Sequence, residues 1–149
     1  MFTHSMPALF SRAEAAEVIR LAEDAHQATG GLVGGLQHHN IRRADIAWLD
    51  DKSSASWVME RIVAGVARAN RERFDFDITD FGERLQVATY DESVAGHYDW
   101  HSDIGDGPLA RRRKLTIVVQ LSEADAYDGG ALEINLGGAV QASERGIGD

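Results

Sequence analysis

The sequence contains no cysteine and only two prolines. Without cysteine, disulfides, thiolate catalysis and cysteine-based zinc sites are excluded. Basic residues are also outnumbered: 15 lysines and arginines face 24 aspartates and glutamates, for a net charge of −9. Phosphate recognition needs a basic face, so we expect neither nucleic acid nor an anionic membrane as a partner. No run of apolar residues approaches membrane-spanning length, and a cytoplasmic protein is expected.

What is present fits a single domain over residues 1–149. Apolar residues make up 44% of the chain, which is enough to bury a sizeable core. Ser11, followed three residues later by Glu14, predicts a capped helix over 12–28. Ser53 or Ser54 predicts the start of a second helix, over about 55–72.

The rest of the chain has the residue pattern of β-strands. Short apolar or alternating runs are separated by turn signals such as "GDGP" and "DGG". Two helices followed by several strands predict an α+β fold, mainly β, with the helices packed against one sheet of a sandwich or barrel. The predicted strands cover 41–49, 84–90, 97–103, 114–121 and 131–136.

The stretch "GHYDWHSDIGDG" holds the candidate chemistry. In a strand, residues two apart share a face, so His101 and Asp103 project together. An imidazole and a carboxylate can hold a divalent cation, and one added histidine would complete the 2-His-1-carboxylate triad that suits Fe(II). A histidine hydrogen-bonded to a nearby carboxylate is the alternative. By the same alternation Asp99 shares their face as a weaker substrate-binding candidate, whereas Tyr98 and Trp100 point toward the core.

The neighbouring residues add a longer pattern. A tyrosine ends the run before the candidate ligands, and a lysine opens the strand after them. The pattern consists of Tyr90, Gly96-x-Tyr98-x-x-His101-x-Asp103, Lys114-Leu115-Thr116, Gln120-Leu121-Ser122 and Gly129-Gly130-x-Leu132.

This pattern resembles the Fe(II)- and 2-oxoglutarate-dependent oxygenases of the prolyl 4-hydroxylase type, and within them the PKHD-type hydroxylases. The resemblance implies a double-stranded β-helix, or jelly roll, with the N-terminal helices packed outside. It implies that His101 and Asp103 are iron ligands and that Tyr90, Thr116 and Gln120 line the 2-oxoglutarate pocket. The implied reaction is hydroxylation of a prolyl residue, a free amino acid or a related small substrate, with succinate and CO2 as co-products and ascorbate as reductant.

The sequence departs from the family at its C-terminal side. The family places a second histidine ligand and a 2-oxoglutarate-binding arginine on later strands, but no histidine follows His101 here. We therefore expect residues 1–149 to be part of a longer hydroxylase from which the C-terminal strands are missing. In the alternatives, the chain is a truncated relative with a crippled site, or His38, His39 or His97 supplies the third ligand.

Two other classes of function stay open. One is a non-catalytic jelly-roll binding module that keeps the half-site without turnover. The other is a cupin-like metalloenzyme that does not use 2-oxoglutarate. The basic run "RRRK" at 111–114 is interpreted as a solvated hairpin, with steering of an anionic cosubstrate as its functional alternative.

Overall fold

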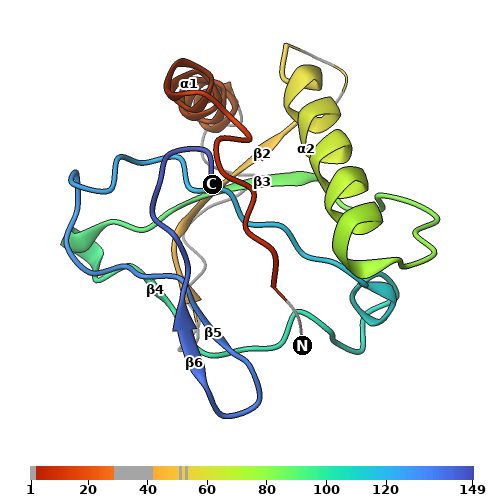
Figure 1. Cartoon of the computed structure of the whole chain (residues 1–149). Coiled ribbons are helices and arrows are strands. Elements are labelled where there is room, and N and C mark those ends of the chain that lie inside the picture. The colour runs from red at the N-terminus through yellow and green to blue at the C-terminus, as the bar shows by residue number, and fades with distance from the viewer. Residues whose placement is uncertain (1–2, 29–41, 51, 53) are drawn as a thin grey trace.

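The fold is α+β, as the sequence predicts. The computed structural model describes residues 3–28, 42–50, 52 and 54–149. Over these residues it contains two α-helices and three antiparallel sheets of two strands each (Figure 1). The three sheets do not join into a closed barrel within the described residues, so the jelly roll stays a prediction. The pairs are β1 (Arg42–Arg43) with β4 (His97–Tyr98), β2 (Asp45–Leu49) with β3 (Leu85–Thr89), and β5 (Glu133–Asn135) with β6 (Val140–Ala142).

The first helix begins where the capping box places it. Helix α1 spans Arg12–Ala28. The Glu14 carboxylate accepts from the Ser11 amide at 2.8 Å, and the Ser11 hydroxyl accepts from the Glu14 amide at 3.2 Å. These reciprocal bonds satisfy amide groups that a helix start leaves without partners. The predicted helix over 12–28 is therefore confirmed.

The second helix differs from the prediction at both ends. Helix α2 spans Ser56–Ala69, and the residue before it, Ala55, has no side chain that can cap it. Ser53 lies outside the described residues. At the other end the helix widens into a π-helical turn over Asn70–Phe74, which closes at Asp75 with a φ of 56°. The α-helix thus ends three residues before the predicted limit.

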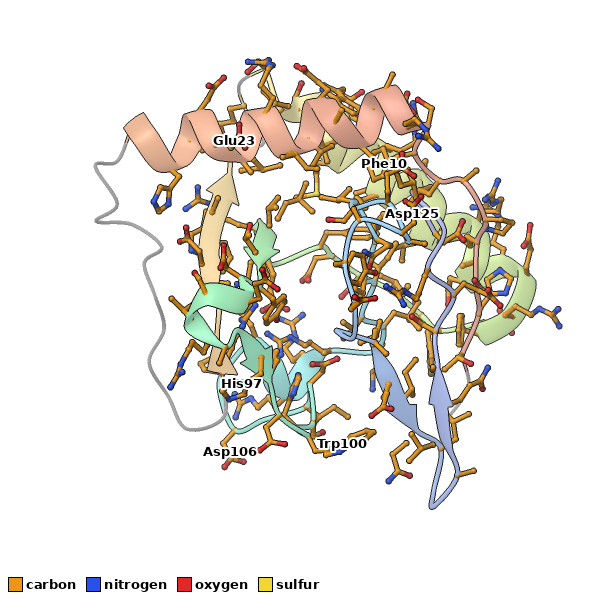
Figure 2. All side chains as sticks on the ribbon, turned by 90° about the vertical axis from the view of Figure 1, so that its left-hand side faces the viewer. Phe10, Glu23, His97, Trp100, Asp106 and Asp125 are labelled. Atoms are coloured by element: carbon orange, nitrogen blue, oxygen red, sulfur yellow. The ribbon has the colours of Figure 1, made fainter. Side chains whose placement is uncertain are left out.

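The core lies between α1, α2 and the β2–β3 sheet. Phe10 is only 2% exposed, and its ring meets Trp57 of α2 edge-on, with 5.7 Å between centroids. Ile46 of β2 is fully buried. Figure 2 shows Phe10 beneath the N-terminal end of α1. The buried cluster is completed by apolar residues of all three elements, namely Val18, Leu21, Ala22, Ala47, Leu49, Val58, Ile62 and Val66.

An ion pair also joins the two helices. The Arg61 guanidinium donates to both Glu14 carboxylate oxygens, at 2.7 and 3.0 Å, and to the Leu9 carbonyl at 2.9 Å. Hydrogen bonds from Arg61 are the main reason that the pKa of Glu14 falls to about 2, from an ordinary value of 4.5. The start of α1 is therefore fixed by α2 as well as by its own cap.

The predicted strand over 114–121 is extended but carries no ladder. Its residues alternate in exposure: Leu115, Ile117 and Val119 pack against the core, while Val118 is 58% exposed. Among the described residues, no backbone hydrogen bond reaches positions 114–119. The exposure alternates as it does in a strand, but pairing depends on a neighbouring strand that the residue pattern does not reveal.

The two ends of the described chain meet beside this segment. The Gly148 amide donates to the Gln120 carbonyl and the Gly148 carbonyl accepts from the Leu9 amide, both at 2.7 Å. The Asp149 side chain accepts from the Ala8 amide at 2.9 Å. Figure 1 shows the C-terminus beside the N-terminal segment, while the β5–β6 hairpin lies at the opposite end of the molecule from α1.

The helices in the described ranges were also compared with the length and apolarity that a membrane span needs. None of them is both long enough and apolar enough to cross a bilayer.

Candidate metal centre

The chain leaves its strand just before the candidate ligands. Within the described residues, strand β4 pairs with β1 at two positions, Arg42 with Tyr98 and Arg43 with His97. The Asp99 carboxylate then accepts from the Trp100 amide at 2.9 Å, a local bond that competes with continued pairing. The predicted strand over 97–103 is therefore wrong beyond Tyr98, and His101 and Asp103 sit on a loop.

The loop still brings the two predicted ligands together. Nε2 of His101 lies 3.4 Å from Oδ1 of Asp103, and their side chains are 34% and 46% exposed. Nδ1 of His101 lies 2.8 Å from the Asp99 carbonyl oxygen. Because a carbonyl oxygen only accepts, this contact places a proton on Nδ1, and Nε2 is then the ring nitrogen that could bind a metal.

This geometry fits a pair of adjacent metal ligands. Two donor atoms, each about 2.1 Å from a cation and at right angles to each other, are about 3 Å apart. The separation of 3.4 Å is close to that value, and both donor atoms belong to partly exposed side chains. The hydrogen bond from the other ring nitrogen to a carbonyl is also the usual support of a metal-binding histidine.

The His101 ring stacks on Tyr98, and Arg42 in turn lies over the Tyr98 ring. The Tyr98 ring stacks on it with 3.7 Å between centroids and 10° between planes. The Arg42 guanidinium carbon lies 4.5 Å from the Tyr98 ring centroid, and Arg42 donates to the Gln86 side chain at 2.6 Å. The three groups form a stack that restricts the imidazole.

The expected core positions of Tyr98 and Trp100 are wrong. Tyr98 is 42% exposed and Trp100 is 54% exposed. Figure 2 shows His97, Trp100 and Asp106 at the end of the molecule opposite α1, away from the core. The strand alternation does not apply after Tyr98, so Asp99 does not share a face with His101 and Asp103 as a strand residue would.

Asp103 is held through its backbone. The Arg113 guanidinium donates to the Asp103 carbonyl at 2.6 Å, and its Nε and Nη2 donate to the two carboxylate oxygens of Glu83. The Glu83 carboxylate is the main cause of the raised pKa of Arg113, and the pKa of Glu83 is lowered in turn. The interpretation of residues 111–114 as a solvated hairpin is therefore wrong for Arg113, whose side chain is only 33% exposed.

The three residues predicted to line the 2-oxoglutarate pocket form no hydrogen bond with the pair in the described part of the chain. Tyr90 follows β3 and is 45% exposed, and Thr116 is exposed on the unpaired segment. Gln120 donates its side-chain amide to the Tyr127 hydroxyl at 2.8 Å. Within the described residues, no hydrogen bond or ion pair joins Tyr90, Thr116 or Gln120 to His101 or Asp103, and their pocket roles stay a prediction.

A third ligand is not found in the part of the chain that the structure describes. No group of three histidine, cysteine, aspartate or glutamate side chains comes together there. Nδ1 of His97 lies 3.0 Å from the Ala95 carbonyl, and His38 and His39 fall outside the described residues. Arg145 donates to the Ala124 and Tyr127 carbonyls, at 3.0 and 2.9 Å. Among the described residues, His101 and Asp103 are therefore the members of the expected triad that lie together.

Sequence reasoning missed Arg113 and Arg42 as supports of the site. A signal for Arg113 was present, because it alternates in phase with Leu115 and Ile117 and so points inward. For Arg42, neither the spacing nor the composition indicates the stack on Tyr98. The chain was also compared with protein-family models, curated proteins and solved structures, and none of the three comparisons gave a match.

Proposed function

We propose that this protein is an Fe(II)- and 2-oxoglutarate-dependent dioxygenase whose iron is held in part by His101 and Asp103. The observation that carries the proposal is the approach of Nε2 of His101 to Oδ1 of Asp103, at 3.4 Å, with Nδ1 engaged by a carbonyl. The substrate class is a prolyl residue, a free amino acid or a related small molecule, taken from the sequence resemblance.

The chain's own residues supply binding and orientation. His101 offers a neutral nitrogen donor and Asp103 offers an anionic oxygen donor, a combination that suits Fe(II). The stack of Tyr98 and Arg42 fixes the plane of the imidazole. When bound, Fe(II) with 2-oxoglutarate and dioxygen supplies oxidising power: a C–H bond becomes C–OH, and 2-oxoglutarate becomes succinate and CO2.

Metal binding is the first test. We expect Mn(II), a paramagnetic stand-in for Fe(II), to broaden the amide NMR signals of residues 99–103 in the wild-type chain. The broadening should be lost in His101→Ala and in Asp103→Asn. Asp106→Asn is the matched control because its exposed carboxylate lies in the same loop outside the pair. Broadening that survives in His101→Ala would refute the ligand assignment.

Turnover is the second test. The assay supplies Fe(II), ascorbate and 2-oxoglutarate and measures succinate, with His101→Ala as the comparison. Succinate formation that needs His101 supports the dioxygenase. Metal binding without any dependence of activity on 2-oxoglutarate would favour a cupin-like metalloenzyme instead. Absence of Mn(II) broadening would favour a non-catalytic binding module and refute the proposal.

A further inference from the structure

The loop that carries Asp103, residues 99–107, forms few described hydrogen bonds with the rest of the molecule. Asp99 bonds locally to Trp100 and His101, and the Gly107 carbonyl accepts from the Arg111 amide at 3.0 Å. Between these points, within the described residues, one hydrogen bond from outside reaches positions 102–106. It is the bond of 2.6 Å from Arg113 to the Asp103 carbonyl.

Arg113 itself is fixed from two directions. Its guanidinium is bound through two nitrogens by Glu83, which lies two residues before β3 and its ladder with β2. Its backbone begins the extended segment whose Leu115 and Ile117 pack against the core. A planar guanidinium held by a fork of two bonds has little freedom, so its remaining nitrogen presents a donor at a defined place.

We infer that Arg113 is a positioning residue that holds the Asp103 carboxylate beside His101 by anchoring the Asp103 carbonyl to Glu83. This inference rests on the proposed metal site. In the part of the chain that the structure describes, no hydrogen bond or ion pair joins Arg113 to the Asp103 carboxylate or the His101 imidazole, so its direct contact with Asp103 is to the backbone. A fixed Asp103 carbonyl restricts the direction in which the Asp103 side chain points. Groups that hydrogen-bond to metal ligands from outside the coordination sphere orient those ligands in a similar way.

The comparison of Arg113 with its neighbour Arg112 gives a matched test. Arg112 donates to Asp80 at 3.1 Å, and its side chain has no hydrogen bond to residues 99–107 in the described structure. Each of the two alanine variants therefore removes one ion pair. Only Arg113→Ala also removes the hydrogen bond to the Asp103 carbonyl. We expect Co(II), followed by titration calorimetry, to bind about 10-fold or more weakly in Arg113→Ala and within about 2-fold of wild type in Arg112→Ala.

Hydrogen exchange provides a readout that needs no metal. Peptides covering residues 100–107 should exchange faster in Arg113→Ala than in Arg112→Ala, while peptides of β2 keep their protection. If Arg113→Ala does not fold, Arg113→Lys and Glu83→Gln replace it. A lysine keeps the charge but cannot bind Glu83 through two nitrogens and reach Asp103 as well. It should therefore show the same loss of Co(II) affinity and the same faster exchange.

The outcomes separate the inference from the proposed function. If His101→Ala binds Co(II) as wild type does, the metal site is wrong and the role of Arg113 falls with it. If His101→Ala loses Co(II) while Arg113→Ala matches Arg112→Ala in affinity and exchange, the positioning role alone is wrong. Weaker Co(II) binding with faster exchange confined to residues 100–107 supports it.

Discussion

Gly148 is the position where one added methyl group should do most harm. Its φ is +77°, and a Cβ there would overlap the Phe10 carbonyl oxygen and lie 2.9 Å from the Phe10 carbon and nitrogen. These are backbone atoms, so no side chain can turn away to make room. We expect Gly148→Ala to separate the chain ends that meet at this point.

The magnitude follows from two contributions. The left-handed backbone conformation costs an alanine about 1–2 kcal/mol. Moving away from Phe10 also breaks the bonds of Gly148 to Leu9 and Gln120, worth about 0.5–1.5 kcal/mol each. The free energy of unfolding should therefore fall by about 2–5 kcal/mol.

Gly137→Ala is the matched control. Gly137 has a φ of +81°, and a Cβ added there would meet no described atom within 4 Å. It carries the same conformational cost, about 1–2 kcal/mol, and the same change in unfolded-chain entropy. Urea unfolding followed by tryptophan fluorescence gives both values, with the slope checked for constancy. A Gly148→Ala value within about 0.5 kcal/mol of Gly137→Ala would refute the reasoning.

The remaining predictions concern the core and the pair between the helices. Phe10→Ala should lower the free energy of unfolding by about 3–5 kcal/mol, because it leaves a cavity against Trp57. Phe81 is half-exposed, so Phe81→Ala should lower it by less than about 1 kcal/mol. Equal effects of the two substitutions in urea unfolding would contradict the assigned core. Glu14 has a folded pKa of about 2 and an ordinary value of 4.5, so its stabilisation is present above pH 4.5 and lost as the pH falls toward 2. The difference in unfolding free energy between wild type and Arg61→Met should therefore shrink over that range, and a constant difference would exclude the Glu14 pair as its source.

Local signals predicted the parts of the fold that local bonds determine. Ser11 and Glu14 are three residues apart, and they form the cap that the sequence indicates. The start of α2 is different, because Ala55 precedes it and packing rather than capping places it there. The apolar run at 114–121 predicted a strand, but among the described residues no backbone hydrogen bond reaches positions 114–119.

The candidate site shows the same division. The proximity of His101 and Asp103 was predicted, although for the wrong reason, since a loop and not a strand brings them together. The Asp99 carboxylate accepts from the next backbone amide, and this local bond competes with continued strand pairing. An aspartate at this position is only a weak signal in the sequence that a strand ends there. The contact of Arg113 with Glu83 joins residues 30 positions apart, so spacing alone could not indicate it.

The junction of Ala8 with Asp149 also bears on the order in which the protein folds. The two residues are 141 positions apart, and closing so long a loop costs conformational entropy before any contact offsets it. Helix α1 has a local cap and the β5–β6 hairpin pairs neighbouring residues, so both can form within microseconds. We therefore expect the bond between Ala8 and Asp149 to form after the transition state for folding. Weakening it should accelerate unfolding while leaving the folding rate almost unchanged.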